Sequence, residues 1–80
     1  MGKYRSLRGF LKRQERRNAD SVLFSEIEDI ISASLPPSAY NHRAWWANSD
    51  SHVQAAEWMS ARWQVDEVSL AERRVRFIPL

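Results

Sequence analysis

Apolar positions near the start of the chain recur at the spacing of a helix. They lie three or four residues apart across 4–16, so they share one helix face while basic residues occupy the other. The residues on the apolar face are Tyr4, Leu7, Phe10 and Leu11. The polar stretch 18–21 ends this helix, and the apolar run 22–24 that follows is short enough to predict a small strand.

The middle of the chain predicts two helices separated by a pair of prolines. Ser25 is followed three residues later by Glu28, which is the spacing of a capping box, and isoleucines then recur at helical spacing. This pattern predicts a helix over 25–33, and the prolines at 36–37 prevent its continuation. A serine directly after the prolines is the predicted cap of a short helix over 38–47.

A second capping box predicts the last helix. Ser51 and Gln54 have the required spacing, and the helix is expected over 51–62. Its expected apolar face consists of Val53, Ala56 and Met59, with Trp58 alongside. Trp58 and Trp63 are expected in the core. The adjacent Trp45 and Trp46 lie about 100° apart around a helix, so one is expected in the core and the other near the surface.

The C-terminal part of the chain predicts a β-hairpin. The segments 64–70 and 74–78 flank a short polar turn, and apolar residues alternate with arginines in the second segment. The resulting order is helix, short strand, helix, short helix, helix, hairpin. Apart from the short helix, this is the order of a winged helix-turn-helix domain. The expected fold class is therefore α+β of the winged-helix type, with one domain over 1–80.

Composition narrows the classes of protein that the chain can represent. Eighty residues suffice for one domain, and 44% of them are apolar, which indicates a globular chain. The absence of cysteine excludes disulfides, thiolate metal sites and thiol catalysis. No apolar run approaches the length of about 18 residues that a membrane helix needs, and the N-terminal residues lack the apolar segment of a signal peptide. We therefore expect a cytoplasmic protein.

The small net charge of +2 is unevenly distributed. Residues 1–17 contain seven basic residues and one acidic residue, which gives +6, whereas residues 18–37 carry −4 and residues 38–80 are balanced. A basic face on one short helix is a plausible footprint for phosphates, because each contacted phosphate releases counterions. The alternative is a solvated basic helix that keeps a small protein soluble.

The winged-helix order predicts a non-enzymatic DNA-binding protein, such as a small transcriptional regulator or an accessory factor of a phage or mobile element. In such domains the helix before the hairpin enters the major groove and the hairpin forms a wing. The residues expected to contact phosphates are Lys3, Arg5, Arg8 and Lys12. Those expected to face base edges are Ser51, His52, Gln54 and Ala55. Those expected on the wing are Arg73 and Arg74.

A second geometry places the short helix over 38–47 in the groove. This helix would present Asn41, His42 and Arg43, and Arg43 would be the guanine reader. A domain of this size covers only a small DNA footprint, so a homodimer or a partner protein would help specificity.

A different class of function is a protein-interaction module. Such a module would bind or inhibit a larger partner through an exposed tryptophan and the basic helix. Salt would distinguish it from a DNA-binding protein, because DNA affinity falls steeply with ionic strength.

Catalysis has little support in the sequence. His42 and His52 are the only histidines, and no motif of metal-ligand spacing contains them. A nuclease would need clustered carboxylates with a lysine, but the only lysines, Lys3 and Lys12, lie in the basic helix. We therefore expect no catalytic residues, no metal site and no cofactor.

Several motifs together resemble a small bacterial and phage domain of unknown function. The resemblance runs from about residue 4 to residue 78, and the motifs that carry it are Leu23-Phe24-Ser25-Glu26-Ile27-Glu28, Leu35-Pro36-Pro37-Ser38-Ala39, Trp45-Trp46-Ala47-Asn48, His52-Val53-Gln54-Ala55, Trp58, Trp63-Gln64-Val65 and Val75-Arg76-Phe77. The related sequences often carry glycine where this chain has Ser32 and Arg62, both near predicted helix ends. The resemblance implies a common fold and no established activity.

Overall fold

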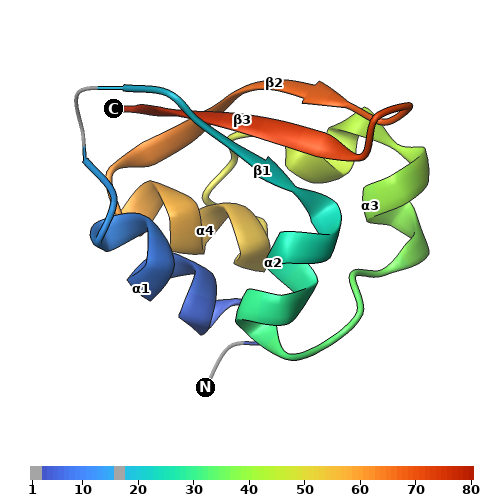
Figure 1. Cartoon of the computed structure of the whole chain (residues 1–80), viewed down its shortest axis with the longest axis horizontal. Helices are drawn as coiled ribbons and strands as arrows, with labels where there is room; N and C mark the ends of the chain where they lie inside the picture. Colours follow the sequence, from blue (N-terminus) through green and yellow to red (C-terminus); the bar gives the residue numbers. More distant parts are fainter. Residues whose placement is uncertain (1–2, 16–17) are drawn as a thin grey trace.

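Three antiparallel strands form one sheet that lies across a layer of helices (Figure 1). The computed structural model describes residues 3–15 and 18–80. The strands are β1 (Asp20–Leu23), β2 (Trp63–Ser69) and β3 (Arg74–Pro79), in the order β1-β3-β2. The sequence-predicted hairpin is confirmed, and β1 pairs with its second strand. The protein is therefore a small α+β domain with β3 at the centre of its sheet.

The helices are α1 (Arg5–Lys12), α2 (Phe24–Ile31), α3 (Pro37–Asn41), α4 (Val53–Ser60) and the 3₁₀ helix η1 (Arg43–Trp46). In Figure 1, α1, α2 and α4 lie beneath the sheet, and α3 lies at the end where the β2–β3 hairpin turns. None of the helices within the described residues is long and apolar enough to span a membrane.

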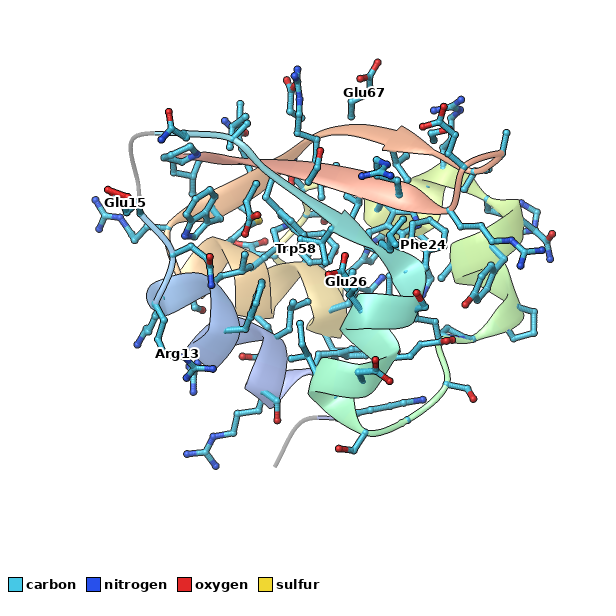
Figure 2. The ribbon with its side chains drawn as sticks, viewed as in Figure 1. Arg13, Glu15, Phe24, Glu26, Trp58 and Glu67 are labelled. Carbon is cyan, nitrogen blue, oxygen red and sulfur yellow. The ribbon has the colours of Figure 1, made fainter. Side chains whose placement is uncertain are left out.

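Aromatic rings form a continuous column through the core. Phe24 of α2 stacks on Trp46 with ring centroids 4.8 Å apart, and Trp46 stacks on Trp58 at 6.0 Å. Trp58 then meets Phe77 of β3 edge-on at 5.6 Å. Figure 2 shows Phe24 and Trp58 between the sheet and the helices. The column joins α2, η1, α4 and the central strand, so large aromatic side chains supply the apolar burial that a short chain needs.

The helix before the prolines begins one residue earlier than predicted, and a different glutamate caps it. Glu26 Oε1 accepts a hydrogen bond of 2.8 Å from Leu23 N–H, whereas the predicted capping residue, Glu28, faces the segment after the helix. Glu28 Oε2 accepts hydrogen bonds of 2.8 Å from Leu35 N–H and from the Tyr40 hydroxyl. Because Phe24 is already helical, the third residue of the helix is Glu26 rather than Glu28.

The predicted single helix over 38–47 is wrong. His42 adopts extended backbone angles (φ −134°, ψ 120°), which separate α3 from η1. The break lets Trp46 turn back into the core, where its indole N–H donates a hydrogen bond of 2.9 Å to the Ala39 carbonyl oxygen. Trp46 is buried and Trp45 is half-buried, as expected for one core and one peripheral ring.

The buried face of α4 also differs from the prediction. The helix begins at Val53, and its buried face consists of Gln54, Ala55 and Trp58. Val53, expected in the core, keeps 71% of its surface exposed. Burial of the large Trp58 ring removes more apolar area from water than burial of Val53, and this difference selects the face that turns inward.

Among residues 3–15 and 18–80, three residues other than glycine adopt left-handed backbone angles. They are Ser32 (φ 56°), Arg62 (φ 70°) and Arg73 (φ 54°). Ser32 and Arg62 each follow the end of a helix, at the two positions where the resemblance implies glycine. Glycine reaches these angles without a steric penalty. The backbone at both helix ends therefore has a geometry that suits glycine.

Candidate nucleic-acid interface

The start of α4 does not present the side chains that were expected to read bases. Gln54 is 8% exposed and Ala55 is fully buried. The Gln54 side-chain amide donates a hydrogen bond of 2.9 Å to the Trp45 carbonyl oxygen. The expectation that these two residues face base edges is therefore wrong, because the helix is rotated to bury Trp58. Ser51 and His52 of the same predicted set are exposed.

The charges around α4 do not favour contact with phosphate. Residues 44–61 contain no lysine or arginine, and they include Asp50 and Glu57. Asp50 is exposed, and the Glu57 carboxylate lies 3.5 Å from Arg8 Nε of α1. A groove-binding helix normally has cations beside it that contact the phosphate backbone. Segment 44–61 therefore supplies no cation of its own, and the basic side chain paired with this helix is Arg8 of α1.

The outer side of α1 is strongly basic. We define the α1 basic face as Lys3, Arg5, Arg8, Lys12 and Arg13. All of these are exposed except Arg8, which is half-buried against Glu57, and no acidic residue occurs from position 3 to position 13. The opposite side of the helix buries Leu7 and Leu11. Figure 2 shows Arg13 beside α1, and its guanidinium folds back over Gly9 of the same helix. Arg13 belongs to this face although it was not among the expected site residues, and Arg16 and Arg17 lie outside the described residues.

A second group of polar side chains, three of them arginines, lies where the hairpin turns. We define the hairpin corner as Asn41, His42, Arg43, Arg73 and Arg74, all of which are exposed. Arg43 of η1 donates a hydrogen bond of 2.6 Å to the carbonyl oxygen of Val68 at the end of β2. The structure thus brings together residues that two alternative sequence interpretations had assigned separately, namely those of the short helix and those of the wing.

The two hairpin arginines have local partners. The Arg73 guanidinium carbon lies 5.4 Å from the ring centroid of Tyr40, which is a cation–π contact. Arg74 lies opposite Ser69 in the sheet, and its Nε is 3.8 Å from Glu72 Oε1. Arg74 and Arg76 lie on β3, the central strand of the sheet.

A hollow of about 370 Å³ lies beside the hairpin corner. It is lined by Leu23, Phe24, Ser25, Glu28, Tyr40, Glu72 and Arg73. Burial and the hydrogen bond to Glu28 raise the pKa of the Tyr40 hydroxyl, and the nearby Arg73 opposes this effect. The hydroxyl therefore stays protonated and holds α3 against α2.

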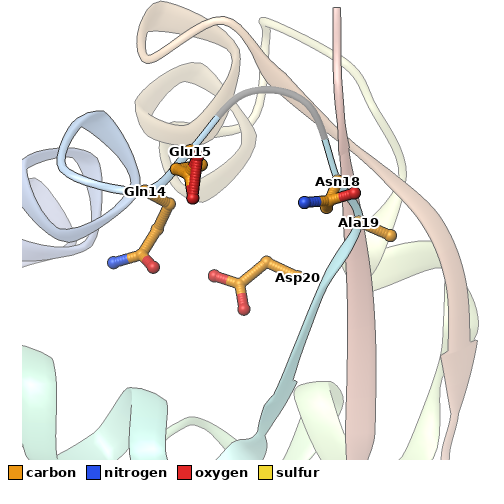
Figure 3. A pocket seen from close by; sticks show the side chains of 5 residues that line it. All are labelled: Gln14, Glu15, Asn18, Ala19 and Asp20. Carbon is orange, nitrogen blue, oxygen red and sulfur yellow. The ribbon is translucent and has the colours of Figure 1, made fainter.

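A smaller hollow of about 200 Å³ lies near the start of β1. Figure 3 shows the Asp20 carboxyl and the Gln14 carboxamide pointing toward one another inside it. Asp20 Oδ2 is buried without a hydrogen-bond partner. Burial, with a contribution from Glu26, raises the pKa of the Asp20 carboxyl. Gln14 directly follows Arg13, so this hollow adjoins the C-terminal end of the α1 basic face.

The tryptophans do not form an exposed anchor for a partner protein. Trp46, Trp58 and Trp63 are buried, and the half-buried Trp45 packs edge-on against Tyr4 with ring centroids 5.8 Å apart. The exposed tryptophan expected for a protein-interaction module is therefore absent, because all four rings are used in the core or at its margin. Within the described residues, no group of three His, Asp or Glu side chains is placed to hold a metal ion.

Asn48 shows that part of the Trp-Trp-x-Asn motif has a structural role. Its Oδ1 accepts hydrogen bonds from the Trp58 indole N–H at 3.0 Å and from Val65 N–H at 2.8 Å. Its Nδ2 donates to the Val65 carbonyl oxygen at 2.8 Å. One side chain thus connects the loop before α4, the core and β2. Sequence analysis did not identify this role, although the spacing of Asn48 from two tryptophans was visible.

Comparison with known proteins identifies a family and no activity. No curated protein and no solved structure matches the chain. One family model matches residues 4–78, which is nearly the whole sequence and includes α1, the hairpin corner and all four tryptophans. The chain therefore belongs to the family described as domain of unknown function DUF7662.

Proposed function

We propose that this protein binds double-stranded DNA without catalysing a reaction, and that the α1 basic face makes the main contacts with phosphate. The observation that carries the proposal is the clustering of five basic side chains, with no acidic residue, across positions 3–13. A small regulator or an accessory factor of a phage or mobile element is the kind of protein that would act in this way.

The order of elements supports a winged-helix relationship. A helix, a strand, helices and a hairpin follow one another, and the sheet has the order β1-β3-β2 with β1 between the first two helices. In this proposal α3 and η1 are an insertion between α2 and α4, and the β2–β3 hairpin is the wing. The winged-helix relationship does not require α4 to read bases, since folds carry their binding sites on different surfaces.

The length of α1 suits contact with a phosphate backbone. Arg5 and Lys12 are seven residues apart, which corresponds to about 10 Å along the helix axis, and Arg13 extends the same surface. Leu7 and Leu11 hold the opposite side in the core, so the cations are carried on a fixed element. Binding through such a face is electrostatic, largely independent of sequence and strongly dependent on salt.

The test is a titration of a short random-sequence duplex by fluorescence anisotropy over a range of salt concentrations. The variant Lys12→Gln/Arg13→Gln removes two exposed cations from the α1 basic face. Its plot of log affinity against log salt should be shallower by about two units, and its affinity at moderate salt should fall by about tenfold or more.

The matched control is Arg62→Asn/Arg76→Gln, which removes two arginines from outside the α1 basic face. Arg62 has a left-handed backbone that asparagine tolerates, and Arg76 pairs with Asp66 on the sheet. The control should keep the salt dependence of the unaltered protein. Absence of binding at low salt, or equal losses in the two variants, would overturn the proposal.

A further inference from the structure

We propose that the hairpin corner binds a second DNA duplex, so that one protein molecule bridges two duplexes. This inference rests on the proposed binding of DNA by the α1 basic face. It adds a second DNA-binding site to the protein. A protein with two such sites would hold separate DNA segments close together.

The first argument is the placement of the two basic surfaces. Figure 1 shows α1 and the β2–β3 turn at opposite ends of the molecule, with the sheet and α2 between them. The core that separates them is tightly packed, because Phe24, Trp46 and Trp58 stack through it. A stiff duplex that lies along α1 therefore does not reach the hairpin corner, and a cationic surface there remains available to another duplex.

The second argument is the way in which the arginines of the hairpin corner are held. Arg43 is anchored to the Val68 carbonyl oxygen, and Arg73 lies on the Tyr40 ring. Guanidinium groups held in this way lose little conformational freedom on binding, and their planar forks match phosphate oxygens. Two elements that are distant in the sequence, η1 and the hairpin, thus present cations on one exposed surface.

The third argument is the balance of charge at this end of the molecule. Glu72 is the acidic residue of the turn, and it is 3.8 Å from Arg74. Glu28, which lines the neighbouring hollow, already accepts hydrogen bonds from Leu35 and Tyr40. Three arginines against these two carboxylates leave a small excess of positive charge at the corner, much less than on the α1 basic face. We therefore expect weaker binding at the hairpin corner than at α1.

A sequential capture experiment tests the inference. A biotinylated duplex is immobilised, saturated with protein and washed, and a fluorescent second duplex is then added at low salt. The unaltered protein should retain the fluorescent duplex. Arg73→Asn/Arg74→Gln should occupy the first duplex normally and retain about tenfold less of the second, because two phosphate contacts are lost.

The control is again Arg62→Asn/Arg76→Gln. This control removes two positive charges, as the hairpin-corner variant does. Arg62 matches Arg73 in its left-handed backbone, and Arg76 matches Arg74 in its place on β3, but neither control residue belongs to the hairpin corner. It should capture the second duplex as the unaltered protein does, when capture is expressed per protein molecule on the first duplex.

The outcomes separate the two proposals. Failure of the unaltered protein to occupy the first duplex overturns the proposed function. Normal occupancy without capture of the second duplex overturns the bridging inference alone. Equal capture by the unaltered protein and the hairpin-corner variant also overturns it, because bridging would then arise from two α1 faces in a dimer.

Discussion

The Asn48 carboxamide forms hydrogen bonds with both backbone groups of Val65, at 2.8 Å each, while its oxygen also accepts from the Trp58 indole. Replacement by alanine removes all three bonds and leaves the indole N–H without its partner inside the protein. We expect Asn48→Ala to lower the free energy of unfolding by about 2–3 kcal/mol, measured by urea denaturation. Asn18→Ala, in an exposed loop position, should change it by less than about 0.5 kcal/mol. Equal effects in the two variants would contradict this role.

Ser32 and Arg62 should accept glycine with a gain in stability. Both have left-handed backbone angles, which cost a residue with a side chain about 1 kcal/mol. Part of the gain is offset by the greater freedom of glycine in the unfolded chain. We expect each of Ser32→Gly and Arg62→Gly to raise the melting temperature. Ser6→Gly, at an exposed position inside α1, should lower it, since glycine weakens helix interiors. Lower melting temperatures in all three variants would be inconsistent with strain at the helix ends.

Asp20 should make stability depend on pH in acid. Burial raises the pKa of its carboxyl in the folded protein above the unfolded value, so the folded state favours the protonated form. The stabilising contribution is complete below the unfolded pKa and is lost as pH rises through the folded pKa. Asp20→Asn should therefore be more stabilising, relative to the unaltered protein, at pH 7 than at pH 3. Urea denaturation at the two pH values measures the difference, and the opposite order would refute this assignment.

The start of α4 should contribute little to DNA affinity. Ser51→Ala/His52→Ala changes two exposed side chains on a segment without lysine or arginine. We expect its affinity for a random duplex to stay within about twofold of the unaltered protein, since no phosphate contact is lost. Gln54→Ala should instead lower stability by about 1–3 kcal/mol, because the Trp45 carbonyl oxygen loses its hydrogen-bond donor. A large loss of affinity in the first variant would restore α4 as a DNA-contacting helix.

The hairpin and the first helix were predictable because their patterns are local. Alternation around Val75 and Phe77 marks a strand with one buried face, and both residues are buried in the structure. Leu7 and Leu11 are likewise buried on the predicted face of α1. In each case short-range spacing and tertiary packing favour the same face.

The errors arose where distant packing decides the local geometry. The orientation of α4 depends on the contacts of Trp58 with Trp46 of η1 and with Phe77 of β3. Both partners belong to other elements of the chain. The break at His42 depends on Trp46 returning to the core. The convergence of Arg43 with Arg73 and Arg74 depends on the contact of η1 with the end of β2. Periodicity within one segment does not contain these relationships.

The contacts of Asn48 and Arg43 with β2 have a consequence for self-association. The Val65 N–H and carbonyl and the Val68 carbonyl are occupied by side chains of this same chain, so they are not available to an incoming strand. Fibril-like stacking propagates only when strands can be added at both margins of a sheet. Blocking the β2 edge in this way limits the addition of strands from other molecules there. It therefore protects this domain, whose aromatic-rich core is covered by a sheet of three strands, from aggregation through that edge.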